Sequence, residues 1–423
     1  MPRFHTLADW LQWQETLHPQ AIDLGLERVA AVAHQMGVQQ PPNQSLTITV
    51  AGTNGKGSTI SLLESVLLAA GYSVGSYTSP HLLHYNERIR INGRAVGDTE
   101  LCDAFEIIDS MRNRQSLTYF EFGTLAALRI MHEAQPDVIL LEVGLGGRLD
   151  AVNIIDTDIA MVTAIGIDHV RWLGVDRDTI AREKAGIFRK GKPAICSDTE
   201  PPGSLRETAD SVGADWYCLE DRFHFKYNDE VWHWSGPGKN YDSLPFPALA
   251  GTHQLRNAAG VLMALELVQD RLPVERNAIE QGFRGVALPG RCQFLAGVRE
   301  TVLDVAHNPQ SSLQLAEVLE QRPEPGATYA VLGMLEDKDI ARYTENLAAV
   351  VDYWCLAGLE AARGLASGDL QRRISACIDP DRVTCFPDVA TAVRHATRAS
   401  AAGDRIVICG SFHTVAESMS CAV

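Results

Sequence analysis

The chain has 423 residues, which is more than one compact core accommodates, so we expect two or three domains. Hydrophobic residues make up 46% of the chain and charged residues 21%, a composition typical of ordinary globular proteins. The formal net charge of −16 disfavours nucleic acid as a partner, because binding a phosphate backbone requires a basic surface. A few local cations, such as Lys56, Arg88, Arg148 and Arg291, can still line a positive site for small anions.

The cysteines and the apolar runs indicate where the protein works. The nine cysteines are scattered and include no C-x-x-C pair, which favours a reducing compartment and disfavours a structural zinc site. No apolar run approaches the ~20 residues that a membrane span needs. The N-terminus, Met-Pro-Arg-Phe-His, lacks the layout of a signal peptide. We therefore expect a cytoplasmic protein without a membrane partner.

The first strong pattern is a predicted strand, loop and helix over residues 46–70. The β-branched run Leu46–Val50 is followed by Ala51-Gly-Thr-Asn-Gly-Lys-Gly-Ser58 and then by a helical pattern over Thr59–Ala70. Glycines let backbone N–H groups turn toward an anion, and the helix N-terminus adds positive partial charge. Lys56 can reach terminal phosphates and the Ser58 hydroxyl can hold magnesium, so the segment predicts a nucleoside triphosphate site. The alternative is a glycine turn that only closes a βα unit.

Polar residues follow the later predicted strands. A second strand over Val74–Thr78 ends at Ser79, before Pro80. Glu142 ends the strand Val138–Val143, and ligands of parallel sheets bind at the carboxyl ends of strands. Glu142 is therefore a candidate magnesium ligand, the alternative being a carboxylate that caps the next turn.

His169 follows the predicted strand Ile159–Ile165 in the same way. A neutral imidazole can complete a metal site, although a single histidine is more commonly structural. Helical patterns at Glu121–Ala134, Arg177–Phe188 and Gln254–Gln269 separate the strands, with a further strand at Pro193–Ser197. Apolar strands without alternation favour a parallel sheet covered on both faces.

Residues 216–234 alternate aromatic and polar side chains, which predicts short antiparallel strands on the edge of that sheet. After a Pro- and Gly-containing break near 287–297, the alternation of strands and helices begins again. Strands are predicted at Val302–Val305, Tyr329–Gly333, Tyr353–Ala357, Val383–Phe386 and Ile406–Cys409. This second half predicts a separate Rossmann-like α/β unit.

Three motifs resemble the Mur ligase superfamily, in particular its folylpolyglutamate synthase and dihydrofolate synthase branch. The loop Gly52-Thr-Asn-Gly-Lys-Gly-Ser58 is similar to the ATP loop of that branch, although Gly57 separates the lysine from the serine and Val50 replaces the first glycine of the common phosphate loop. The stretch Leu141–Asn153 resembles the family motif LEVGLGGRLDATN, with Val152 in place of threonine. The stretch Glu183–Ile187 resembles the EKAGI motif, whose lysine is carbamylated in the family.

The resemblance implies a fold and a set of site residues. It implies an α/β fold with an N-terminal P-loop ATPase-like domain of mostly parallel sheet over residues 1–288, a linker over 289–297 and a Rossmann-like C-terminal domain over 298–423. It implies magnesium ligation by Ser58, Ser79, Glu142, His169 and carbamylated Lys184, with catalytic roles for Lys56, Lys184 and His169. The implied nucleotide-binding residues are Thr53, Asn54, Gly55, Lys56, Gly57, Ser58, Asn257, Arg291, Asp304 and His307.

Further segments resemble those that bind the pterin substrate in the bifunctional enzymes. They supply the expected substrate-binding residues Asp23, Leu24, Gly25, Leu26, Arg28, Tyr119, Phe120, Glu121, Phe122, Gly123, Leu149, Asp150 and Ala151. Gly410-Ser-Phe-His413 resembles the family near the end of the chain, so the likeness spans nearly its whole length.

The activity that the resemblance implies is ATP-dependent addition of L-glutamate to dihydropteroate, to the glutamate tail of reduced folates, or to both. ATP and magnesium, expected as two ions and with room for a monovalent cation, are the implied cofactors, and a monomer is expected. A folylpolyglutamate synthase without dihydrofolate synthase activity is the close alternative. A cell-wall peptide ligase is disfavoured because too little chain precedes the loop for a UDP-binding domain, and a nucleotide-driven switch would give the glycine-rich stretch at 144–150 no role.

Overall fold

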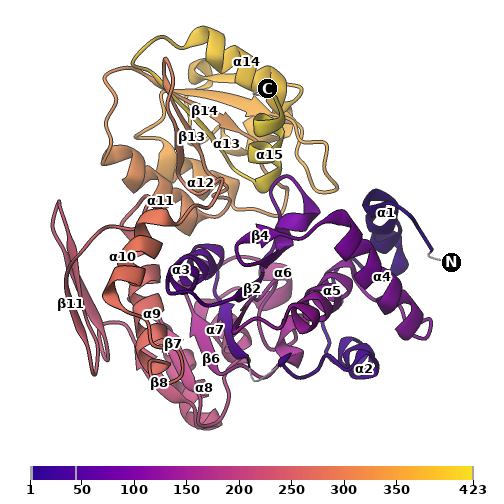
Figure 1. Ribbon diagram of the computed structural model, residues 1–423. Helices are drawn as coiled ribbons and strands as arrows, with labels where there is room; N and C mark the ends of the chain where they lie inside the picture. Colours follow the sequence, from indigo (N-terminus) through magenta and orange to yellow (C-terminus); the bar gives the residue numbers. More distant parts are fainter. Residues whose placement is uncertain (1–2, 43–44, 422–423) are drawn as a thin grey trace. The chain divides into compact units, whose positions relative to one another are not determined.

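The structure is a computed structural model that describes residues 3–42 and 45–421 (Figure 1). Its contacts divide the chain into two compact units. The first comprises Met1–Gly166, Arg171–Ala248 and Leu255–Val286, and the second comprises Ile167–Val170, Leu249–Gln254 and Ala287–Val423. Two short segments therefore belong with the second unit although residues of the first unit flank them on both sides.

An eight-stranded sheet with the order β4-β3-β2-β5-β1-β6-β7-β8 forms the framework of the first unit. The strands are β1 (Leu46–Ala51), β2 (Val74–Tyr77), β3 (Ile89–Ile91), β4 (Arg94–Ala95), β5 (Val138–Glu142), β6 (Ile159–Val162), β7 (Pro193–Cys196) and β8 (Asp215–Cys218). The central strand β1 pairs in parallel with β5 and β6, and all six of its residues are buried. Only the pairings of β2 with β3 and of β3 with β4, at one edge of this sheet, are antiparallel. The predicted α/β fold with a mostly parallel sheet is confirmed.

Helices cover this sheet. They are α1 (Leu7–Leu17), α2 (Glu27–Met36), α3 (Lys56–Ala69), α4 (Asp98–Met111), α5 (Tyr119–Ala134), α6 (Val170–Leu173), α7 (Arg177–Ala185), α8 (Gly203–Val212), α9 (His253–Leu267) and α10 (Arg276–Gly285). Helix α5 packs on β2 and against α4 (Figure 1). Helix α10 lies directly on α3, where a Cβ at Gly282 would stand 2.5 Å from the Cα atom of Val66, so only glycine permits this approach.

The prediction for residues 216–234 is wrong in part. Strand β8 does lie at the edge of the large sheet, but it pairs in parallel with β7, because helix α8 supplies the crossover that parallel neighbours need. The antiparallel strands β9 (His224–Tyr227), β10 (Trp232–Ser235) and β11 (Asn240–Leu244) form a separate three-stranded sheet. The alternation of aromatic and polar residues indicated strands but could not assign their partners.

The second unit contains a six-stranded sheet with the order β12-β13-β17-β14-β15-β16. Its strands are β12 (Gln293–Leu295), β13 (Glu300–Leu303), β14 (Thr328–Leu332), β15 (Tyr353–Ala357), β16 (Val383–Phe386) and β17 (Arg405–Cys409). Its helices are α11 (Pro309–Glu320), α12 (Ile340–Leu347), α13 (Ser367–Ile374), α14 (Val389–Ala399) and α15 (Phe412–Cys421). Strand β12, which falls in the predicted linker, pairs antiparallel with β13, while the other neighbours are parallel.

Candidate active site

The phosphate loop lies between the end of β1 and the start of α3, as the sequence predicts. Gly52 has φ 152° and Gly55 has φ 94°, which is backbone that favours glycine. A Cβ at Gly52 would stand 1.8 Å from Thr163 Oγ1, and one at Gly55 would stand 2.7 Å from Asn257 Oδ1. Both glycines are therefore required by close neighbours as well as by their backbone conformation. The loop opens onto the N-terminus of a 14-residue helix, an arrangement that binds anions.

Two lysines converge on the first residue of this loop. The Nζ atom of Lys56 lies 3.1 Å from the carbonyl oxygen of Gly52 and 3.3 Å from that of Thr53. The Nζ atom of Lys184, in α7, lies 2.9 Å from the same Gly52 carbonyl oxygen, and its side chain is buried. Two ammonium groups beside one carbonyl repel each other, so this position favours a negatively charged group between them. The structure thus brings together two residues that are 128 positions apart and that the family resemblance assigned to one site.

Asn257 also reaches the loop. It lies on α9, and its side-chain amide faces Gly55 closely enough to exclude any larger residue there. Thr53 is fixed from the other side, because its hydroxyl donates to the carbonyl of Gly166 and accepts from the N–H of that residue, both at 3.0 Å. The predicted nucleotide residues of the first unit therefore form one connected group.

Glu142 and Ser79 meet at the carboxyl ends of β5 and β2. The Ser79 backbone N–H donates to Glu142 Oε2 at 3.1 Å, and the Glu142 side chain is buried. Within residues 3–42 and 45–421, no group of three or more His, Cys, Asp or Glu side chains could hold a metal ion. One carboxylate still fits magnesium, which takes few protein ligands and completes its shell with water and phosphate oxygens.

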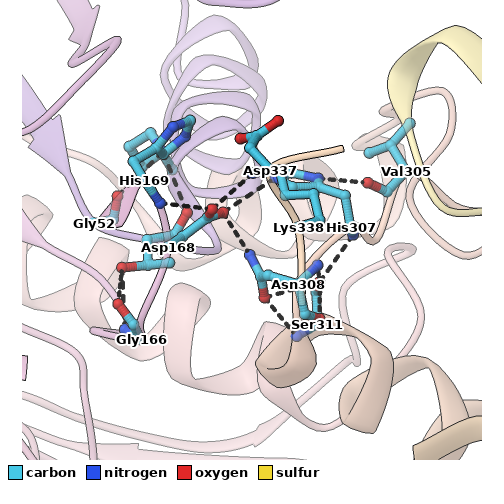
Figure 2. Close-up of polar contacts among 12 residues, drawn as sticks. Gly52, Gly166, Asp168, His169, Val305, His307, Asn308, Ser311, Asp337 and Lys338 are labelled. Carbon is cyan, nitrogen blue, oxygen red and sulfur yellow. Dashed lines mark hydrogen bonds and ion pairs between the residues drawn. The ribbon is translucent and has the colours of Figure 1, made fainter. Parts of the chain in front are cut away.

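His169 lies in the short segment 167–170, which belongs to the second unit. Its neighbour Asp168 accepts hydrogen bonds from Lys338 Nζ at 2.7 Å and from Asn308 Nδ2 at 3.1 Å, and His307 Nε2 lies 3.4 Å away (Figure 2). Burial alone would raise the pKa of Asp168, but the hydrogen bond from His307 and the charge of Lys338 hold that pKa far below its ordinary value. The segment that carries His169 is therefore held by a buried ionised carboxylate.

Sequence reasoning missed Asp168, Asn308 and Lys338 as a group. Lys338 stands in the charged run Leu335-Glu-Asp-Lys-Asp339, which is typical of an exposed turn, yet its side chain is only 6% exposed. Asp168 precedes the predicted metal ligand His169, but no pattern in the sequence predicted an ion pair for Asp168 itself. Only the tertiary fold brings positions separated by 170 residues into contact.

The remaining predicted nucleotide residues lie in the second unit. Asp304 is buried and accepts hydrogen bonds from the N–H groups of Cys292 and Ala306, both at 2.7 Å. It therefore fixes the backbone next to Arg291, whose guanidinium stacks 5.0 Å from the ring of Phe412. His307 also bonds the Val305 carbonyl through Nδ1 at 2.8 Å. The roles of these residues toward a nucleotide stay predictions.

The predicted substrate segments lie together in the first unit. Arg28 Nε donates to both carboxylate oxygens of Glu121, at 2.9 and 3.0 Å, and its Nη atoms bond the side chain and the carbonyl of Asp23. Arg28 thus ties the 23–28 loop to the N-terminus of α5, where Glu121 also completes a capping box with Thr118. Asp23, Arg28 and Glu121 therefore stabilise the local fold through these contacts. Their contact with a substrate stays a prediction.

Asp150, at the third predicted substrate segment, is buried before the short helix η3 (Ala151–Ile154). Its carboxylate accepts from the N–H groups of Leu145 at 2.8 Å and Val152 at 3.1 Å. Burial raises the pKa of Asp150 to about 7, although these backbone donors and the charge of Lys56 act to lower it. The protonation of this side chain therefore changes near neutral pH.

This shift predicts a pH-dependent stability. The unfolded chain ionises the Asp150 carboxyl near a pKa of about 3.9, so between that pH and about pH 7 the folded protein holds the extra proton. The contribution of Asp150 to the free energy of unfolding therefore falls as pH rises through this window and is constant above it. Asp150→Asn lacks this ionisation. In urea unfolding from pH 4 to 8, the free energy of unfolding of the variant relative to that of wild type should therefore rise with pH up to about pH 7. Asp229→Asn, at an exposed position, serves as the control, and parallel pH profiles for Asp150→Asn and wild type would contradict the prediction.

No helix in the described part of the chain is both long enough and apolar enough to cross a membrane.

Comparison with known proteins places this geometry in a family. Residues 50–265 match the Mur ligase middle domain, and residues 290–412 match the Mur ligase, glutamate ligase domain. The chain is 44% identical over 413 residues to the dihydrofolate synthase/folylpolyglutamate synthase of Escherichia coli (strain K12), which covers 98% of this chain and 94% of that relative.

Solved structures agree with this match. One is E. coli FolC in complex with DHPP and ADP, which is 44% identical with a TM-score of 0.94 and covers 99% of this chain and 98% of that chain. Another is a bifunctional folylpolyglutamate synthase/dihydrofolate synthase with Mn, AMPPNP and L-glutamate bound, which is 44% identical with a TM-score of 0.92 and covers 100% of this chain and 99% of that chain. The predicted resemblance is confirmed, and the chain belongs to the Mur ligase family, among the dihydrofolate synthase/folylpolyglutamate synthases.

Proposed function

We propose that this protein is an ATP-dependent ligase that adds L-glutamate to dihydropteroate and to the glutamate tail of reduced folates. The observation that carries the proposal is the convergence of Lys56 and Lys184 on the Gly52 carbonyl, at the mouth of a phosphate loop. The relatives that are 44% identical over nearly the whole chain are bifunctional enzymes of this kind.

The reaction follows from the chemistry of a carboxylate. A carboxylate is a poor electrophile, so the substrate carboxylate first attacks the γ-phosphorus of ATP, giving an acyl phosphate and ADP. The amine of glutamate then attacks the acyl carbon, the amide bond forms, and phosphate leaves with the electrons of the broken C–O bond. Lys56 neutralises charge that develops on the transferred phosphoryl group. No side-chain nucleophile is needed, because the two substrates supply both nucleophiles.

The chain's own residues have distinct roles in this proposal. Ser58 and Glu142 would hold one magnesium ion, and Ser79, His169 and carbamylated Lys184 would hold a second. Such ions would supply positive charge to the phosphate oxygens and to the substrate carboxylate. Asn257, Arg291, Asp304 and His307 would bind the nucleotide, and a monovalent cation is a further cofactor in this proposal. We also propose a cytoplasmic monomer with domains over 1–288 and 298–423 joined by the linker 289–297.

Dual specificity is the prediction that tests the proposal most directly. Purified enzyme with ATP, magnesium and glutamate should convert both dihydropteroate and tetrahydrofolate into products that are heavier by one glutamyl residue. ADP release should require glutamate and one of the two acceptors, and mass spectrometry with an ADP assay measures both. Extension of tetrahydrofolate alone would leave a folylpolyglutamate synthase, and ATP hydrolysis without glutamate or acceptor would point to a nucleotide-driven switch.

A further inference from the structure

Arg88 is a buried cation that has no carboxylate partner among the described residues. Three arginines are buried among the described residues: Arg88, Arg112 and Arg405. Arg112 pairs with Asp109 at 2.7 Å and Arg405 pairs with Glu300 at 2.9 Å. Arg88, only 9% exposed, forms no ion pair with any residue in 3–42 or 45–421. Burying a charge without a counter-charge is costly, so such a site is suited to an anionic ligand.

The groups around Arg88 are aromatic or neutral. Its guanidinium lies 5.2 Å from the ring centroid of Tyr85 and 5.4 Å from that of Tyr119. Its Nε atom donates to His81 Nδ1 at 2.9 Å. Burial raises the pKa of Tyr77, whereas the charge of Arg88 and a hydrogen bond from it act to lower that pKa, so the Tyr77 hydroxyl also lies beside the guanidinium. A guanidinium has five N–H donors, so these two neutral partners leave donors for a further acceptor. Two tyrosine faces hold the guanidinium plane without neutralising its charge.

The adjacent carboxylate is committed elsewhere. Glu87 accepts from the backbone N–H groups of Leu82, Leu83 and His84, at 2.7, 2.8 and 2.7 Å. These bonds outweigh burial and lower the pKa of Glu87, so it stays ionised as the cap of the helix η2 (Tyr85–Arg88). Glu87 therefore shapes the loop that carries Arg88 and does not balance its charge.

A second buried polar group points into the same place. The Tyr85 hydroxyl is buried and has no hydrogen-bond partner among the described residues. A Cβ at Gly123 would stand 2.6 Å from this hydroxyl and 3.0 Å from that of Tyr77, so the glycine of α5 leaves the room that both hydroxyls need. Tyr119 and Gly123 belong to a predicted substrate segment, which places Arg88 beside the residues expected to bind the pteroate.

The backbone also ties Arg88 to the predicted metal site. Its carbonyl accepts from the N–H of Thr78 at 2.8 Å, and the next residue along the chain, Ser79, donates to Glu142. The backbone of Arg88 is therefore held next to the start of the loop that carries Ser79, one of the residues expected to hold magnesium.

We infer that Arg88 is a substrate-binding residue whose guanidinium takes the carboxylate of dihydropteroate, an acid carried on a flat aromatic ring, with Tyr85 and Tyr119 on either side. The inference rests on the proposed function and adds a residue that the sequence analysis noted only as a local cation. An arginine binds a carboxylate through two parallel hydrogen bonds, which fixes the plane of the acid as well as its position.

The test compares dihydropteroate with its carboxamide, which keeps the aromatic rings and loses the charge. Equilibrium binding is measured by fluorescence titration without glutamate, so that no product forms. Wild type should bind the acid on the order of 10- to 100-fold more tightly than the amide, as expected for a charge-assisted pair. Arg88→Met should lose most of that preference while its affinity for the carboxamide stays within about threefold. Arg88→Lys keeps the charge without the paired donors and should retain a reduced preference.

Arg94→Met removes an exposed arginine from β4 and serves as the matched control. Thermal unfolding shows which variants are folded. If Arg88→Met does not fold, the comparison of acid and amide is made with Arg88→Lys. Equal weakening of acid and amide in the folded Arg88 variants, or an undiminished preference for the acid, would overturn the inference and leave Arg88 a structural residue. Failure of wild type to bind dihydropteroate would instead overturn the dihydropteroate part of the proposed function, and this inference with it.

Discussion

Lys56→Ala should lower kcat by about a thousandfold or more while the protein remains folded. Lys56 begins α3, and its ammonium group lies at the carbonyls of Gly52 and Thr53 in the phosphate loop, so alanine removes a positive charge from the loop itself. Removing one preorganised group that stabilises charge in the transition state costs on the order of 10²–10³-fold, and an essential phosphoryl-binding cation costs about 10³–10⁵-fold. Steady-state kinetics with saturating ATP measures the loss.

Lys190→Ala is the matched control, because Lys190 is exposed and its removal changes the net charge equally. Its kcat should equal that of wild type, and both variants should unfold within a few degrees of it. A folded Lys56→Ala enzyme with near-normal turnover would refute the assignment of the phosphate loop.

Lys184→Met should abolish most activity, and a short carboxylic acid should restore part of it. An unmodified Lys184 brings a second ammonium to the Gly52 carbonyl that Lys56 already bonds, where the two cations repel each other. A carbamate on Nζ keeps one N–H for that carbonyl and replaces the positive charge with two oxygens, the donors that magnesium prefers. The methionine variant keeps the apolar stem of the side chain and removes Nζ together with its carbamate, and added acetate can occupy the space that the carbamate leaves.

Carbon-13 NMR of protein equilibrated with labelled bicarbonate measures the modification itself. Wild type should show a carbamate signal that Lys184→Met lacks and that Lys190→Ala retains. An active wild-type enzyme without that signal would exclude the carbamate, whatever the activity of the variant.

The sequence predicted the central strands and the phosphate loop correctly because their signals are local. Leu46–Ala51 is rich in apolar and β-branched residues and is buried on both faces, as suits a strand between two parallel neighbours, and the phosphate loop with Gly52 and Gly55 follows it. The assignments of Lys56 and Lys184 to one site came from the family resemblance, and their common contact with Gly52 agrees with it.

What sequence patterns could not predict depends on tertiary contact. Helix α1 was not predicted, although Thr6 caps it through the N–H of Asp9, because it is held by aromatic contacts such as that of Trp10 with Phe105. The burial of Lys338 and Arg88 was not predicted either, since a charged side chain in an ordinary loop is more commonly exposed. These side chains are buried because segments that are distant in sequence pack against them, and neither hydrophobic periodicity nor motif spacing predicts such packing.

The segment 167–170 has a consequence for how such enzymes can be recombined. Its Asp168 is the counter-charge of Lys338. A chain divided near residue 286, where the main part of the second unit begins, has Asp168 in its N-terminal part and Lys338 in its C-terminal part. A chimaera that joins residues up to 286 from one relative with the remainder from another inherits the acid from one parent and the base from the other. Exchange of halves should therefore succeed between relatives that share both residues, and a parent that lacks either one would leave a buried charge unbalanced.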